Sequence, residues 1–210
     1  KLKILAEIKI LIIYLFFLTG EHNFFKLPVI TEDVHDIKDF SNLQLKDKIT
    51  IISFLGADLN EDKTSALNIN MKIYNRFFMF DDFQFISLLP IGSEEKAMNL
   101  KNELTAITGT DLSKWGFVFL KDDQLNKIFD SLNLPVFLDD NLSSPYVYII
   151  DKDLNLRGNR DDDNFIGYNS KSIADINNNM VDDVKVILAE YRMALKKYNP
   201  LAVTGSCVSV

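Results

Sequence analysis

Apolar residues recur along the chain in two patterns, and each pattern predicts one kind of element. Short, almost unbroken apolar or β-branched runs predict buried strands, which are residues 49–55, 83–89, 115–120 and 145–150, with 154–158 as the second arm of a hairpin. Apolar residues at steps of three and four predict amphipathic helices, which are residues 62–78, 93–107, 122–132 and 172–197. This order predicts an α/β domain with a mixed sheet flanked by helices on both faces.

The same stripes predict which side of each helix is buried. The residues expected to face the core are Leu67, Met71, Tyr74 and Phe78; Ala97, Leu100, Leu104 and Ile107; and Ile173, Ile176, Met180, Val184, Ile187, Tyr191 and Leu195. At the helix starts, Asp122 is expected to cap one helix, and Ser172 with Asp175 to form a capping box.

The N-terminal segment has a different pattern. Residues 8–18 are almost all apolar without a polar face, and Lys1, Lys3 and Lys9 surround their start. Such a segment is typical of a signal sequence or a membrane anchor, and a buried amphipathic helix is the alternative. Since no clear cleavage site follows, we expect a retained N-terminal hydrophobic helix.

Three parts are therefore predicted. They are residues 1–20 as membrane anchor or signal segment, 21–199 as the folded domain and 200–210 as a disordered tail.

Charge and cysteine content exclude two classes of function. The net charge is −7 and the pI about 4.9, and an acidic surface repels phosphate backbones, so nucleic acid is excluded as a partner. The single cysteine, Cys207, lies in the predicted tail. Disulfide exchange needs a second thiol, so the chain is predicted to be redox-inactive.

Four local segments in one order resemble the SCO/SenC family of thioredoxin-like, membrane-tethered proteins. They are residues 39–48, similar to a polar hairpin end; Ile51–Gly56, similar to the strand before the active-site loop; Ser113–Phe117, with its tryptophan; and Ser143–Asp151, similar to a late strand and turn. The resemblance covers about residues 27–197 and implies a thioredoxin-like fold, a membrane tether, a location on the outer, periplasmic side of a bacterial membrane and a protein partner.

The chain departs from that family at the residues that carry its chemistry. Family members that handle copper have two cysteines, three residues apart, in the loop after the first core strand, and a distant histidine. Here residues 56–63 contain no cysteine and residues 138–144 no histidine. Soft Cu(I) prefers thiolate and thioether ligands, so no copper site and no other cofactor are predicted.

The predicted remnant of the active-site loop contains Asp58, Glu61 and Asp62, and the fold analogy places Pro145, with a cis peptide bond, beside them. These carboxylates could bind a hard cation or a cationic partner, or Asp58 or Asp62 could cap the next helix. The other candidates are weaker. Residues 151–155 are expected to form a β-turn rather than a calcium loop, residues 161–164 a solvated acidic loop, and His22 and His35 are expected to be structural or exposed.

The prediction for function is a membrane-tethered, redox-inactive binding or assembly factor that is not an enzyme. The alternative is an enzyme or a hard-cation-binding protein that uses the carboxylates of the 58–62 loop.

Overall fold

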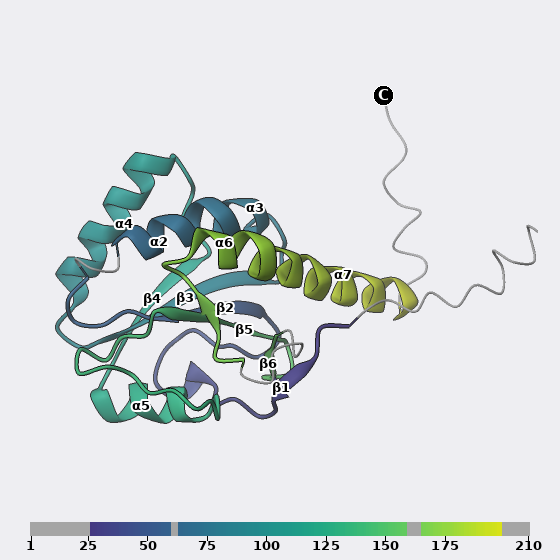
Figure 1. The fold of residues 1–210 in the computed structure, drawn as a ribbon, viewed down its shortest axis with the longest axis horizontal. Helices are drawn as coiled ribbons and strands as arrows, with labels where there is room; N and C mark the ends of the chain where they lie inside the picture. The colour runs from purple at the N-terminus through teal and green to yellow at the C-terminus, as the bar shows by residue number, and fades with distance from the viewer. Residues whose placement is uncertain (1–25, 60–62, 159–164, 199–210) are drawn as a thin grey trace, which may run out of the picture.

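The computed structural model describes residues 26–59, 63–158 and 165–198, and shows a sheet with helices on both faces (Figure 1). Its strands are β1 (Val29–Thr31), β2 (Ile49–Phe54), β3 (Phe83–Pro90), β4 (Trp115–Leu120), β5 (Tyr146–Ile150), β6 (Leu156–Arg157) and β7 (Tyr168–Asn169). The order across the sheet is β1-β6-β5-β2-β3-β4, with β7 paired to β5. The predicted mixed sheet is therefore confirmed.

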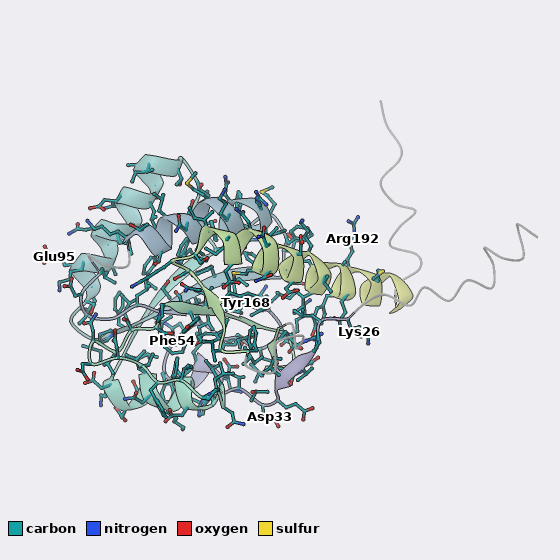
Figure 2. The ribbon with its side chains drawn as sticks, viewed as in Figure 1. Lys26, Asp33, Phe54, Glu95, Tyr168 and Arg192 are labelled. Carbon is teal, nitrogen blue, oxygen red and sulfur yellow. The ribbon has the colours of Figure 1, made fainter. Side chains whose placement is uncertain are left out.

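The direction of the strands decides where their loops meet. β2, β3 and β4 run parallel, whereas β5 is antiparallel to β2 and pairs Thr50 with Ile150. The carboxyl ends of β2, β3 and β4 and the amino end of β5 therefore lie at one edge of the sheet, called the carboxyl edge below. Glu95 follows the carboxyl end of β3 and lies at the opposite end of the molecule from Lys26 (Figure 2).

Two apolar cores lie on the two faces of the sheet, because alternate residues of each strand point in opposite directions. On β2, Ile49 and Ile51 belong to one core and Ile52 and Phe54 to the other. The first core is covered by the helical segments α2 (Lys63–Ile69), η2 (Asn70–Tyr74, a π-helix), α3 (Asn75–Phe77), α4 (Glu94–Thr108), α6 (Ile173–Asp175), η3 (Ile176–Met180, a π-helix) and α7 (Val181–Tyr198). The second core is covered by α5 (Asp122–Asp130) and the 3-10 helix η1 (Ile37–Asp39). This is the predicted two-sided arrangement.

The predicted burial of the first helical region is confirmed for Tyr74, which is fully buried, and for Leu67 and Phe78, which are partly buried against the core, but it is wrong for Met71. Met71 is 53% exposed, and Ile73 and Phe77, which were not predicted, are buried. The buried stripe also includes Asn70, which is fully buried and accepts a hydrogen bond from the Thr110 hydroxyl at 3.4 Å. A polar residue in the core hid the correct stripe from a count of apolar positions.

The predicted helix ends are partly wrong. Ile107 and Ile173, each in a terminal turn, are 65% and 50% exposed. The residue before α5 is Lys121, whose backbone N–H donates to the Gln124 side chain at 3.0 Å, so Asp122 lies inside the helix. At the start of α6 the Ser172 hydroxyl accepts the Asp175 N–H at 3.2 Å, as expected of a capping box. The Asp175 carboxylate, however, accepts the N–H of Asn169 at 2.6 Å.

The segment before β2 contains no hairpin in its described residues, contrary to the prediction. Its strand β1 pairs with β6 instead. The Asp36 carboxylate organises the rest, since it accepts the N–H groups of Lys38 at 3.3 Å and Leu45 at 2.7 Å. The segment therefore folds around a buried carboxylate rather than around strand pairing.

Candidate functional site

Two loops lie against each other at the carboxyl edge. The loop that follows β2 and the connection that precedes β5 are joined where the Ser144 N–H donates to the Phe54 carbonyl at 3.0 Å. We call residues 55–58 and 138–145 together the loop cluster. The sequence predicted this juxtaposition, and it is present for the described residues.

Asn141 holds the loop after β2 in place. Its main-chain carbonyl accepts the Ala57 N–H at 3.2 Å, and its side-chain carbonyl accepts the Asp58 N–H at 3.1 Å. The contact is so close that a Cβ on Gly56 would lie 2.3 Å from both the carbonyl oxygen and the side-chain nitrogen of Asn141. Only glycine fits at position 56 without a shift of the backbone.

Asp139 shapes the second loop of the cluster. One carboxylate oxygen accepts the N–H groups of Asn141 at 3.0 Å and Ser143 at 2.8 Å, and the other accepts the Ser143 hydroxyl at 2.8 Å. Leu142 between them has a φ of 59°, which an ordinary residue adopts only when its surroundings require it. The carboxylate of Asp139 therefore serves the backbone, and through it places Asn141.

The predicted site residues contribute less than the sequence indicated. Asp58 is exposed, and Glu61 and Asp62 lie outside the described residues. Pro145 is exposed and its preceding peptide bond is trans, so the predicted cis bond is wrong. The Pro145 carbonyl accepts both the N–H and the hydroxyl of Ser170, at 2.9 and 2.7 Å. Among the described residues, no three His, Cys, Asp or Glu side chains converge as metal ligands would.

Of the other candidate residues named from the sequence, some have a structural role and the rest lie outside the described residues. Asp151 and the residues after it form the expected turn, in which its carboxylate accepts the N–H groups of Asp153 at 2.9 Å and Asn155 at 2.8 Å. His35 is structural, since its ring stacks on Phe40 with centroids 5.6 Å apart. The remaining candidates, His22, the acidic run 161–164 and Cys207, lie outside the described residues.

A buried charge cluster at the other end of the sheet was missed by the sequence analysis. The Arg157 guanidinium bonds to the carboxylates of Asp151 and Glu190, both at 2.8 Å, and to the Leu27 carbonyl, at 2.9 Å from its Nε. The side chains of Arg157 and Asp151 are only 5% and 1% exposed. Burial disfavours the charged guanidinium, but the bonds and charges of Asp151 and Glu190 outweigh it and raise the pKa of Arg157. Arg157 therefore joins β6, the N-terminal segment and α7.

The predicted membrane anchor lies outside the described residues. Within the ranges that the structure describes, no helix has both the length and the apolar character needed to cross a bilayer.

Comparison with known proteins identifies the fold but not the family. No family model matches the sequence, and no curated protein matches it. Among solved structures, a candidate protein disulfide isomerase from Bacteroides thetaiotaomicron is 15% identical and has a TM-score of 0.52, with 81% of this chain and 98% of that one covered. The fold is thioredoxin-like.

Proteins of the Sco family share this thioredoxin-like fold. BsSco, a member of the Sco family of cytochrome c oxidase assembly proteins, is 13% identical with a TM-score of 0.50, over 81% of this chain and 98% of its own. A SCO1/SenC family lipoprotein from Bacillus anthracis is 18% identical with a TM-score of 0.46, over 83% and 99%. The similarity to BsSco confirms the resemblance to SCO/SenC proteins at the level of the fold.

Proposed function

We propose that this chain is a redox-inactive binding or assembly protein, tethered to the outer face of a membrane by residues 1–20. The observation that supports this most directly is the pair of hydrogen bonds accepted by Asn141, called the Asn141 clamp, in which the side-chain amide holds Asp58 and the main-chain carbonyl holds Ala57. The residues that surround this clamp offer backbone, amide, hydroxyl and carboxylate groups. They are suited to positioning a loop and to contact with another protein.

The chemistry of the donors supports the redox part of the proposal. Thiol–disulfide exchange requires an attacking thiolate and a second thiol that resolves the mixed disulfide. Cu(I) favours soft sulfur ligands over carboxylate and amide oxygens. No cysteine occurs in residues 56–63 or 138–145. The loop cluster therefore lacks the donors that either reaction needs.

The role of a fold neighbour supports the assembly part. BsSco belongs to a family of cytochrome c oxidase assembly proteins. We propose a comparable role for this chain, in which a membrane protein or membrane-associated protein is bound and no copper is transferred. The negative net charge makes nucleic acid an unfavourable partner.

Copper and disulfide assays test the redox part. The full chain with Cys207→Ser is titrated with Cu(I) against a competing chelator and assayed for reduction of a test disulfide, with BsSco as a thiol-containing reference. We expect neither competitor-resistant Cu(I) binding nor reduction. Stoichiometric Cu(I) retention, or a stoichiometric metal that is lost on Asp58→Ala or Asp62→Ala, would contradict the proposal, the second in favour of a carboxylate-based site.

A cross-linking experiment tests the binding part. A photoreactive residue is placed at Asp58 in the loop cluster, or at Met98 on α4, which is 59% exposed and serves as the control. In native membranes we expect one adduct of defined mass from position 58, reduced by excess unlabelled chain, and none from position 98. Equal labelling from both positions would show that the loop cluster is not a binding surface.

A further inference from the structure

The connection between α5 and β5 contains a segment, Leu134–Leu138, in which the chain bends at Pro135 and exposure alternates from residue to residue as it does along a strand. Leu134, Val136 and Leu138 are partly buried and pack on the core beneath α5. Pro135 is exposed, and Phe137 is 85% exposed, more than any other large apolar side chain among the described residues. The segment has the side-chain pattern of a strand but belongs to no sheet.

The backbone of this segment is unpaired. Across the described chain, no hydrogen-bond partner is found for the N–H or C=O groups of Leu134, Val136, Phe137 and Leu138. Pro135 has no N–H, and the backbone groups of successive residues in a strand point to opposite edges, so each edge of Val136–Leu138 offers only one or two residues for pairing. Such free groups are a short template for an added strand, the mode of recognition in which main-chain bonds supply affinity and side chains supply specificity.

Both ends of the segment are held in place. Before it, the Leu132 carbonyl accepts the Thr31 hydroxyl at 2.7 Å, and the Ser131 hydroxyl accepts the His35 N–H at 2.9 Å. After it, the Asp139 N–H donates to the Ser143 main-chain carbonyl at 3.1 Å. A segment fixed in this way loses little conformational freedom when a partner binds.

The charges around the segment select the partner. Asp130, Asp139 and Asp140 flank it and are exposed, and the sequence has no lysine or arginine between Lys127 and Lys152. Two copies of this chain that paired through this segment would bring acidic ends together in either direction, which is unfavourable. The complementary partner carries positive charge.

We propose that Leu134–Leu138 is the docking edge for an extended, positively charged segment of a partner protein. That segment pairs with the free backbone as a β-strand and packs an apolar side chain against Phe137, while its basic residues lie near the flanking aspartates. The inference rests on the proposed binding role and adds to it the chemistry of the partner.

Peptide binding tests the inference on the full chain carrying Cys207→Ser. The probe is a short fluorescent peptide of alternating lysine and valine, compared with the same peptide N-methylated at every residue, which blocks the N–H groups of both strand edges. We expect the first to bind and the second, which keeps the charge but cannot pair its backbone, to bind about tenfold more weakly or less. Because one added strand pairs with alternate residues, amide exchange should slow either at Phe137 or at Val136 and Leu138, and on addition of the first peptide only.

Two variants locate the binding. Phe137→Ala should weaken binding of the lysine–valine peptide about tenfold, whereas Ile107→Ala, at another exposed apolar residue, should leave it unchanged. Asp130→Asn with Asp140→Asn should reduce its salt dependence.

Three results would overturn the inference: no binding of the lysine–valine peptide, equal binding of both peptides, or binding that Phe137→Ala leaves unchanged. Protection of the Val136, Phe137 or Leu138 amides that rises with protein concentration alone would also overturn it, in favour of a second copy. None of these results bears on the copper, disulfide and cross-linking tests, so failure of the inference and failure of the proposed function are distinguishable.

Discussion

The two ends of the sheet use their polar side chains in opposite ways. At the carboxyl edge, the side chains of Asp139 and Asn141 accept hydrogen bonds from backbone N–H groups of the two loops, and the surface around them is exposed. At the far end, Arg157 and Asp151 are buried, Glu190 is 19% exposed, and the guanidinium of Arg157 is paired with both carboxylates. The buried ion pairs of this domain thus lie at the end of the sheet far from the loop cluster. In the loop cluster itself, the polar side chains fix the shape of an exposed surface.

The largest effect is expected from Arg157→Met. The substitution leaves two carboxylates without their partner in a buried place, and breaking a buried ion pair on one side typically costs about 3–5 kcal/mol. Urea unfolding of the variant measures the loss. Arg192→Met is the matched control. Arg192 lies on α7, the helix that carries Glu190, but it is exposed and points away from the domain (Figure 2). A loss below about 1 kcal/mol for Arg157→Met would mean that the cluster contributes no more than a surface pair.

A smaller loss is expected when the loop cluster is overpacked. Gly56→Ala places a methyl group 2.3 Å from the Asn141 carbonyl, so one of the two loops must shift, at a cost of about 1–3 kcal/mol. Ala57→Ser, at the next and exposed position, is the control. Thermal unfolding compares the two. Equal stability of both variants would show that the loops separate freely.

Asn141→Ala removes one bond of the clamp and leaves the main-chain bond to Ala57 intact. We expect a loss of about 1 kcal/mol and faster amide exchange at Asp58, whose N–H loses its acceptor. Asp140→Asn, one residue away, should change neither quantity. Unchanged exchange at Asp58 in Asn141→Ala would contradict the clamp.

The smallest effect concerns Asp183, a buried carboxylate on α7. Asp183 is 8% exposed, and burial raises its pKa above the ordinary value of 3.8, although a hydrogen bond from the Tyr168 hydroxyl at 2.7 Å opposes this. The folded state therefore binds this proton more tightly than the unfolded state does. Its contribution to stability is complete below pH 3.8 and is lost as the pH rises through the raised value.

Asp183→Asn should remove that dependence. At neutral pH the variant is expected to be as stable as the parent or more so, by on the order of 1 kcal/mol, and the advantage should disappear toward pH 3.8. Glu190→Gln on the same helix is the contrast, since its carboxylate is paired with Arg157 and should lose stability at neutral pH. Chemical unfolding across this pH range measures both. A variant of Asp183 that is least stable at neutral pH would reverse the assignment.

The elements that the sequence predicted correctly are those determined by local pattern. β2, β3, β4 and β5 come from uninterrupted apolar runs, which a buried strand requires on both faces. β1 and β7 were missed because each has only two or three residues and exists through its pairing with β6 or β5. A strand of that length has no periodicity to detect.

The loop cluster was predictable in position and not in detail. The resemblance to thioredoxin-like proteins placed the loop after β2 beside the residues before β5, and the two segments are in contact in the structure. The clamp depends on the side chain of Asn141 and the missing Cβ of Gly56, which are far apart in the sequence. The Arg157 cluster was missed for a related reason, since a charged residue after a polar turn is usually exposed and its partner Glu190 lies on a different element.

The hydrogen bond from the Arg157 guanidinium to the Leu27 carbonyl affects how the domain would respond to a pulling force. A pull on the chain that precedes Lys26 reaches the domain at this residue, and the load passes through the guanidinium into β6 and α7 together. The short strand β1 does not carry the tension by itself. Force applied through a tether at this point would be shared by β6 and α7 and would not act on the edge strand β1 alone. The domain would therefore resist local unfolding at this edge of the sheet.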